Sequence, residues 1–329
     1  MKIFLTHTPK MRANYYGDNA LNSLKSLAEV QLHEADTALL PAALITAAGD
    51  AEIVVSDRLT IGAAAVFSGL PKLRAFLRCA VDIRDVDVDA ASAAGVLVTR
   101  AKPGFVESVA ELTVGFLVDL ARGISRSASA NHANQLPKIQ MGRQLSGSVI
   151  GIVGYGSIAR HLAHLVETMG MKVLIADPHV EVDDPRFGQV DFETVLSEAD
   201  HVVCLASATD ASENLFNFAA FQRMKPEAVF VNVSRGNLVD EAALAAALDA
   251  GIIAGAAMDV GRALDQMPTR SLAERSNVIA TPHIGGLTQP AIEAQAFDTV
   301  EQVRAIVNGK IPHGAINADR WSRRFDRVP

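Results

Sequence analysis

The sequence predicts an α/β fold with two doubly wound parallel-sheet domains, and three observations support this. The chain has 329 residues, of which 49% are apolar, so it is long enough for two cores of ordinary size. Short apolar segments alternate with helical ones along most of its length, as they do where helices cover both faces of a parallel sheet. A glycine-rich turn at residues 154–156 joins one strand to the helix after it.

The first hundred residues hold the first set of alternating elements. We expect strands in the segments KIFLTH, EVQLHE, EIVVSD, LRAFLRC and VLVTR, and helices near residues 19–28, 41–48 and 87–94. A longer helix is expected over residues 105–120, because Val109, Leu112 and Phe116 recur on one side of it. The polar segment 122–144 separates this helix from the glycine turn, and we interpret it as a domain boundary.

The second set of elements begins at Val149. Strands are expected in VIGIV, KVLIAD, HVVCLA, VFVNV, AGAAMDV and NVIATP, with helices between them. Such a succession forms a doubly wound parallel sheet. A last helix is expected over residues 289–307, before a tail that holds Trp321.

The segment 149–160, VIGIVGYGSIAR, has the form of a dinucleotide-binding turn. An apolar strand runs into Gly154-Tyr155-Gly156, where glycine lets the backbone turn tightly and approach a pyrophosphate. The helix that follows would direct its free N–H groups at phosphate. The third glycine of the motif is replaced by Ala159, which is still small enough for close packing of helix on strand.

Asp177 ends the second strand of this unit, in the run KVLIADP. It follows Gly156 by twenty-one residues, which is where a carboxylate accepts hydrogen bonds from the adenosine ribose hydroxyls. The same carboxylate would repel a 2′-phosphate, and Pro178 supplies no compensating cation. The sequence therefore favours NAD over NADP.

Composition argues against several other classes of protein. The formal charge of −7 is spread along the chain, so neither nucleic acid nor an anionic membrane is an expected partner. No apolar run reaches the ~18 residues that span a bilayer, and MKIFLTH leads into a strand, so we expect a cytoplasmic protein. Cys79 and Cys204 lie in apolar runs without metal-like spacing, and we interpret them as small core residues.

Three further segments accompany the glycine turn: PGFVESVAE (103–111), VNVSRGNLVDEAAL (231–244) and ATPHIGG (280–286). With Asp177, they resemble the D-isomer-specific 2-hydroxyacid dehydrogenase family, of the phosphoglycerate dehydrogenase-like kind, and this chain looks like an atypical member. The resemblance covers the whole chain in the family's order.

The resemblance implies a particular domain organisation. A Rossmann domain that binds NAD would occupy residues 102–287, inserted into a flavodoxin-like substrate domain formed by residues 1–101 and 288–329. It also implies a homodimer whose substrate is a small 2-hydroxy or 2-keto acid, with no metal.

Two residues match the family's catalytic pair. Arg235, in SRG, matches the substrate arginine, whose planar guanidinium can hold a carboxylate and polarise the neighbouring carbonyl. His283, in TPHIGG, matches the general acid/base. An imidazole titrates near pH ~6.5, so it can take the proton from a hydroxyl as hydride leaves for NAD and return it in the reverse reaction.

The resemblance also assigns contacts with the cofactor. Ser157 and Ile158 match the helix start that faces the phosphates, and Val233 and Ser234 match the wall beside the nicotinamide. Asp259 matches the acceptor for the carboxamide, although an aspartate there can equally be a helix N-cap. The residues expected at the cofactor are Gly154, Tyr155, Gly156, Ser157, Ile158, Asp177, Val233, Ser234, Arg235, Asp259, His283, Gly285 and Gly286.

The first departure from the family pattern concerns the partner of His283. The family pairs its histidine with a glutamate five residues after the position of Asp259, and here that position is Leu264. Asp265 is the neighbour, and a shift of one residue in the loop would bring its carboxylate to His283; a solvated loop aspartate is the alternative. A nearby carboxylate favours imidazolium, so without one we expect His283 to be mostly neutral at pH 7, a base suited to oxidation.

The second departure lies in RCAVDIRDVD, at residues 78–87. The family's loop normally offers glycine and backbone N–H groups to the substrate carboxylate, and here the substrate loop would consist of Val81, Asp82 and Arg84. An acidic side chain at this place would repel a carboxylate, which suggests an unusual substrate. The alternative is that Asp82 pairs with Arg84 or with a backbone amide away from the substrate.

These observations predict an NAD-dependent dehydrogenase that acts on a CH–OH group. Hydride would pass between NAD(H) and C2 of a small D-2-hydroxy acid, with Arg235 binding the acid and His283 exchanging the proton. The alternative is a regulatory or binding protein of the same fold that senses NAD(H) with little or no turnover, and Leu264 is the residue that favours it.

Overall fold

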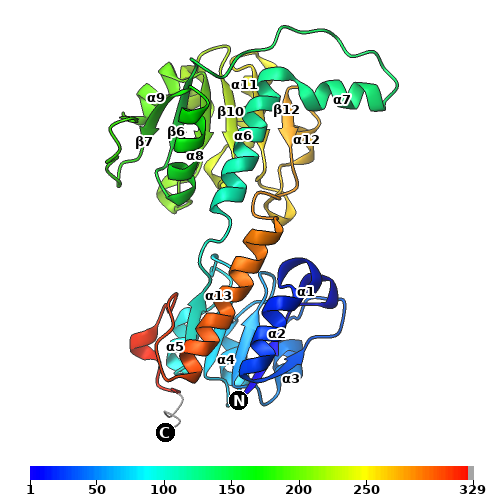
Figure 1. The fold of residues 1–329 in the computed structure, drawn as a ribbon, viewed down its shortest axis with the longest axis vertical. Coiled ribbons are helices and arrows are strands. Elements are labelled where there is room, and N and C mark those ends of the chain that lie inside the picture. The colour runs from blue at the N-terminus through cyan, green and yellow to red at the C-terminus, as the bar shows by residue number, and fades with distance from the viewer. Residues whose placement is uncertain (325–329) are drawn as a thin grey trace. The chain divides into compact units, whose positions relative to one another are not determined.

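A computed structural model describes residues 1–324, except for the side chain of Asp265 (Figure 1). The chain forms two compact units. Unit 1 comprises Met1–Phe105 and Leu287–Pro329, and unit 2 comprises Val106–Gly286. Each unit is a parallel sheet with helices on its faces, so the predicted fold class is confirmed.

Unit 1 contains a five-stranded parallel sheet in the order β2-β1-β3-β4-β5, which is the flavodoxin-like order. Its strands are β1 (Lys2–Leu5), β2 (Glu29–Leu32), β3 (Ile53–Ser56), β4 (Ala75–Arg78) and β5 (Leu97–Arg100). Its helices are α1 (Pro9–Tyr15), α2 (Asp18–Leu27), α3 (Pro41–Ala48), α4 (Ala64–Gly69), α5 (Val88–Ala93), α13 (Gln289–Val307) and the 3₁₀ turn η4 (Ala318–Arg320).

The alternation of side chains along β1 builds two cores, one on each face of this sheet. Ile3 and Leu5 belong to one cluster and Phe4 to the other, as the period of two in a strand requires. Helix α13 supplies Val300 and Val303 to the first cluster and packs beside α2 (Figure 1). Its bounds are those predicted from the sequence.

Unit 2 contains a seven-stranded parallel sheet in the order β12-β11-β10-β9-β6-β7-β8. Its strands are β6 (Val149–Val153), β7 (Lys172–Ala176), β8 (Gly188–Gln189), β9 (His201–Cys204), β10 (Val229–Asn232), β11 (Gly255–Met258) and β12 (Val278–Ala280). The chain first builds from β6 toward β8, then returns to place β9 on the other side of β6. Ligands of such sheets bind at this reversal, outside the carboxyl ends of the strands.

The helices of unit 2 cover both faces of its sheet. Helices α6 and α8 pack against each other, and α9, α10 and α11 form a second packed group (Figure 1). The elements are α6 (Val106–Arg122), α7 (Ile124–His132), α8 (Ser157–Thr168), α9 (Phe192–Glu198), α10 (Phe218–Arg223), α11 (Glu241–Asp249) and α12 (Arg270–Ala273), with 3₁₀ turns η1 (Asp210–Ser212), η2 (Gly236–Leu238) and η3 (Leu264–Gln266).

The interpretation of segment 122–144 as a domain boundary was wrong. This segment lies inside unit 2 and contains helix α7, which the sequence did not predict. None of the residues of α7 is buried, so it has no apolar face from which a helical period could be read. Helix α1 was missed for the same reason.

Two other expectations concern the interior and the membrane. Cys79 and Cys204 are buried and are not joined in a disulfide, which confirms their interpretation as core residues. Among the described residues, no helix is both long enough and apolar enough to cross a bilayer.

His201, the first residue of β9, should make the stability of unit 2 depend on pH. Burial lowers the pKa of this imidazole to about 4. The charge of Asp200 raises the pKa, and the charge of Arg143 lowers it, but both effects are smaller than that of burial. Because the unfolded chain takes up this proton near pH ~6.5, the contribution of His201 to stability is complete above that pH and is lost as the pH falls toward 4. We expect the free energy of unfolding to drop by about 2 kcal/mol between pH 7.5 and 5 from this group.

Urea unfolding at a series of pH values, followed with a probe in unit 2, would measure this dependence. His201→Gln is the matched variant, because it keeps a polar side chain but cannot titrate. An equally steep loss of stability in this variant would show that His201 is not the group responsible.

Candidate functional site

The carboxyl edge of the unit 2 sheet gathers the predicted residues of this unit. The glycine turn follows β6 and Asp177 follows β7, while Arg235, Asp259 and His283 follow β10, β11 and β12. Strands β10, β11 and β12 are consecutive neighbours in the sheet. Parallel strands deliver the residues after them to one edge, so the candidate catalytic pair and the glycine turn lie at the same edge.

The glycine turn meets the requirements of a pyrophosphate cradle. Gly154 has φ +95°, and a Cβ there would lie 2.6 Å from backbone atoms of Leu205 and Ala206. Gly156 has no atom within 4 Å of where a Cβ would be, so its surface is open to a ligand. It precedes α8, whose N-terminus has no side-chain cap. Ala159 is fully buried, as expected for the packing position of the motif.

Asp177 is bonded directly to the glycine turn. Its Oδ2 accepts the Tyr155 N–H at 2.7 Å, and its Oδ1 accepts the N–H groups of His179 and Val180 at 2.8 and 3.0 Å. A carboxylate has about four acceptor positions. The three bonds therefore fix the orientation of Asp177 and leave it capacity to accept from a ribose hydroxyl.

The segment that carries Arg235 is held by its neighbours. Ser234 Oγ donates to the carbonyl of Ala206 at 2.6 Å, and the fully buried Asn232 donates to the carbonyl of Arg235 at 3.0 Å. A Cβ on Gly236 would lie 2.0 Å from the carbonyl oxygen of Gly261. Only glycine fits where the two backbones come this close. The backbone after Arg235 is therefore in direct contact with the loop after β11.

Asp259 fixes the segment that carries His283. Its Oδ1 accepts from Thr281 Oγ1 at 2.6 Å and from the Ile284 N–H at 2.8 Å, and its Oδ2 accepts the Gly285 N–H at 2.8 Å. Asp259 is 2% exposed, so these bonds compensate the burial of its charge. A Cβ on Gly285 would lie 2.9 Å from Oδ2, which accounts for the glycine.

This geometry changes the interpretation of Asp259. The alternative role as an N-cap is wrong, because the next helical turn is η3 and its N-cap residue is Ala263. Contact with the carboxamide stays a prediction. The bonds that the structure contains make Asp259 a positioning residue for His283.

His283 has a backbone conformation that non-glycine residues rarely adopt, with φ +56°. Its N–H donates to the carbonyl of Thr281 at 3.0 Å, and the bonds from Asp259 hold the residues on both sides of it. Residues held in this region cluster at functional sites, where the surrounding structure maintains the strain. The side chain is half-buried.

The loop after Asp259 is held by residues that the sequence reasoning missed. Glu241 is 7% exposed and accepts the Arg262 N–H at 2.9 Å and the Thr269 hydroxyl at 2.5 Å. Arg262 donates to Glu213 at 2.9 Å. A glutamate at the first helical position reads as an ordinary helix-dipole residue, so no signal in the sequence indicated these contacts.

The glutamate of the family pattern is replaced in this chain. Leu264 occupies its position, and the side chain of Leu264 is 88% exposed. The side chain of Asp265 lies outside the described part of the structure, so the proposed pairing of Asp265 with His283 stays a prediction.

Val81, Asp82 and Arg84 lie in unit 1, in the loop after β4. Arg84 forms a bidentate ion pair with Asp82, with Nε to Oδ1 at 3.0 Å and Nη2 to Oδ2 at 2.6 Å. Arg78, which is 2% exposed, donates to the carbonyls of Asp57 and Asp82 and so ties this loop to the loop after β3. The charge of Asp82 is therefore compensated by Arg84, as the alternative interpretation expects.

Comparison with known proteins decides the family. The model of the NAD-binding domain of D-isomer-specific 2-hydroxyacid dehydrogenases matches residues 114–285. The chain belongs to this family. It is 33% identical to an (S)-sulfolactate dehydrogenase of Chromohalobacter salexigens. The two sequences match over 266 residues, which are 79% of this chain and 86% of that protein. The family resemblance inferred from the sequence is therefore confirmed.

Two other relatives define the extent of the similarity. The chain is 31% identical over 301 residues to a D-3-phosphoglycerate dehydrogenase of Synechocystis, across 90% of this chain and 54% of that protein. It thus spans about half the length of that relative. A crystal structure of a protein from Thermus thermophilus superposes with a TM-score of 0.86 at 27% identity, covering 96% of this chain and 100% of that one.

Replacement of Asp259 tests its positioning role. Asp259→Asn removes the charge that accepts the Ile284 and Gly285 N–H groups, and we expect unit 2 to lose about 2 kcal/mol of stability. Thermal unfolding measures this loss, and titration with NAD measures cofactor affinity. Asp191→Asn is the control, because asparagine serves as well as aspartate at the N-cap that Asp191 provides for α9.

If Asp259→Asn weakened the binding of NAD while stability stayed unchanged, the contact with the carboxamide would be the better account. The positioning role requires that stability falls in this variant and not in the control.

Proposed function

We propose that this chain is an NAD-dependent dehydrogenase that moves hydride between the nicotinamide and C2 of a small D-2-hydroxy acid. The observation that carries the proposal is the convergence of Arg235 and His283 at the sheet edge that also holds the glycine turn. Family membership supports the same reaction. An arginine and a histidine at one edge supply the two functions that the chemistry needs: a cation for the carboxylate and a group that exchanges a proton.

The residues of the cofactor site fit NAD. The open surface at Gly156 and the uncapped N-terminus of α8 suit a pyrophosphate, and Asp177 suits unphosphorylated ribose hydroxyls. Bound NAD would supply the hydride acceptor. Val233 is almost fully buried, and Ser234 is tied to the end of β9, so together they would form a rigid wall beside the nicotinamide.

The catalytic residues divide the remaining work. Arg235 would hold the substrate carboxylate through its planar fork and polarise the oxygen on C2. His283 would take the hydroxyl proton in oxidation and return it in reduction. The bonds between Asp259 and the His283 segment keep the imidazole in one place, which favours a productive geometry.

A protein that senses NAD(H) with little turnover is the second candidate. The specific observation that favours it is Leu264, whose exposed side chain stands where the family has the carboxylate partner of the histidine. The dehydrogenase is the better supported of the two, because the histidine and the arginine are both retained and both positioned. A sensor requires neither.

Kinetic variants separate these candidates. We expect Arg235→Gln and His283→Gln to lower kcat/KM by about 10³-fold, since each removes a group used in the transition state. The measurement is absorbance of NADH at 340 nm across small 2-keto and D-2-hydroxy acids, and Arg223→Gln, an exposed arginine paired with Glu193, is the control.

Binding of NADH without turnover of any acid in the wild-type protein would overturn the dehydrogenase and favour the sensor. Turnover that survives in both variants would show that Arg235 and His283 are not the catalytic pair.

The substrate loop of unit 1 is expected to accept an ordinary carboxylate, because Arg84 compensates Asp82. The idea of an unusual substrate depends on an uncompensated Asp82, and the ion pair argues against it. Arg84 is 63% exposed and Asp82 33%, so the pair is in contact with solvent and its electrostatic effect is moderate.

Breaking this pair should expose the carboxylate of Asp82 to the substrate. We expect Arg84→Gln to raise KM for an anionic substrate by about three- to tenfold with a smaller change in kcat. The double variant Arg84→Gln with Asp82→Asn should restore KM. A KM that is unchanged in the single variant would place the pair away from the substrate.

A cytoplasmic homodimer is also part of the proposal. In support of an interface between copies, Leu136 and Ile139 are almost fully exposed, at 95% and 103%, in the segment between α7 and β6. Such a group of large apolar side chains is unusual on the surface of a monomer.

A further inference from the structure

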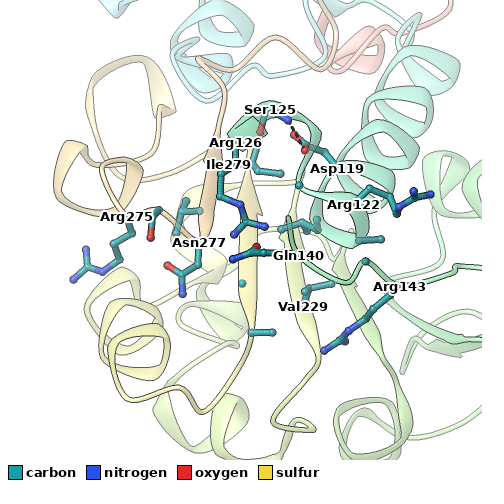
Figure 2. Close-up of a pocket in the computed structure, with 18 of the residues that line it drawn as sticks. Asp119, Arg122, Ser125, Arg126, Gln140, Arg143, Val229, Arg275, Asn277 and Ile279 are labelled. Carbon is teal, nitrogen blue, oxygen red and sulfur yellow. Dashed lines mark hydrogen bonds between the residues drawn. The ribbon is translucent and has the colours of Figure 1, made fainter. Parts of the chain in front are cut away.

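A pocket of about 440 Å³ lies in unit 2 at the edge of the sheet opposite the candidate active site. His201, Val229, Gly255 and Val278, each the first residue of a strand from β9 to β12, lie in its wall. The end of α6, the start of α7 and residues 140–143 complete it. Figure 2 shows Arg122 and Arg143 on one side of the pocket and Arg275 and Asn277 on the other.

The lining of this pocket is strongly cationic. It contains four arginines and one acidic residue, Asp119. Asp119 accepts the Ser125 N–H at 2.8 Å and so stabilises the start of α7 (Figure 2). The lining arginines are Arg122, Arg126, Arg143 and Arg275.

Two of these arginines are already neutralised and two are not. Arg143 pairs with Glu227 at 3.2 Å, and Arg275 pairs with Asp249 at 2.8 Å. Within the described part of the chain, the guanidinium groups of Arg122 and Arg126 have neither an ion pair nor a hydrogen bond. The Arg126 guanidinium lies over Gly123, where an added Cβ would be 2.6 Å from Nη2.

A buried polar atom in the wall gives an independent indication of a ligand. The side chain of His201 is 2% exposed, and its Nδ1 has no hydrogen-bond partner. A buried polar group without a partner is unfavourable unless something binds to it. His201 lies on the face of β9 opposite Val202 and Cys204, which belong to the core formed with α9 and α10.

We propose that this pocket is a binding site for a small anion that carries phosphate or carboxylate groups. The guanidinium groups of Arg122 and Arg126 would bind its oxygens, and the imidazole of His201 would complete its hydrogen bonds at the base of the pocket. This site is separate from the site of hydride transfer and does not depend on the proposed function.

Occupation of the pocket would join three segments of unit 2. The anion would connect the end of α6 at Arg122 with the start of α7 at Arg126 and with the first residue of β9, His201. Charge-assisted bonds from two arginines would hold these segments together. An effect on the order of α7 is therefore expected as well as an effect on stability.

Calorimetric titration of the full chain with inorganic phosphate, and separately with citrate, tests the proposal. Both run at constant ionic strength and with saturating NAD, so that the glycine turn does not compete for phosphate. We expect saturable binding of at least one probe in the millimolar range or tighter. Arg122→Gln and Arg126→Gln should each weaken it by about tenfold.

Arg270→Gln is the matched control, because Arg270 lies in the same unit, is 91% exposed and does not line the pocket. Hydrogen exchange within residues 123–129 should slow on binding in the wild-type protein only. Far-ultraviolet circular dichroism checks that each variant is folded, and the double variant Arg122→Lys with Arg126→Lys, which retains the charge, should keep part of the affinity.

Three results would overturn the proposal. The first is no saturable binding of either probe, and the second is equal affinity in the wild-type protein and the glutamine variants, which would place the anion elsewhere. The third is dissociation of an oligomer by the glutamine variants with unchanged binding of phosphate, which would assign the arginines to contact between copies. Turnover of 2-hydroxy acids is measured separately, so failure of either proposal is distinguishable from failure of the other.

Discussion

The buried carboxylate of Asp259 is the interaction on which the rest of the candidate site depends. It lies at the end of β11, between the strands that lead to Arg235 and His283. An ionised group at 2% exposure would be strongly unfavourable without partners. The three hydrogen bonds that compensate it all come from the segment of His283. The chain can therefore bury this charge favourably only when the segment of His283 is in its correct place.

The same site depends on glycines at points where backbones meet. Gly154, Gly236 and Gly285 each lie where a Cβ would be within 3 Å of a backbone or carboxylate atom. Each one brings the end of one strand close to the end of its neighbour. These close approaches between adjacent strand ends act together with the side-chain hydrogen bonds of Asp177, Asn232 and Asp259 to fix the geometry of the site.

Most of the architecture could be predicted from the sequence, because buried strands and amphipathic helices leave clear periods. Helix α13 was predicted to the residue, and six of the seven strands of unit 2 were expected. The helices α1 and α7 were missed because they bury no side chain, and α4 was missed because its six residues are too few to show a helical period. Strand β8 was missed because two exposed residues, Gly188 and Gln189, carry no pattern.

The candidate site was less accessible to sequence reasoning. Motifs indicated which residues follow which strands, but not what each side chain bonds to. The pairing of Asp82 with Arg84 and the bonds of Asp259 to its loop depend on backbone positions that only the folded chain supplies. Glu241 carried no signal at all, because its partners are more than twenty residues away in the sequence.

The return of the chain to unit 1 through α13 has a consequence for folding during synthesis. Unit 2 is continuous in sequence, whereas the core of unit 1 needs Ala296, Val300 and Ile306 from the far end of the chain. A ribosome that has made the first hundred residues has therefore made a sheet with one apolar face only partly covered, by α2 and without α13. Exposed apolar surfaces are prone to aggregation. This face of the nascent N-terminal region stays incompletely covered until almost the whole polypeptide has emerged from the ribosome.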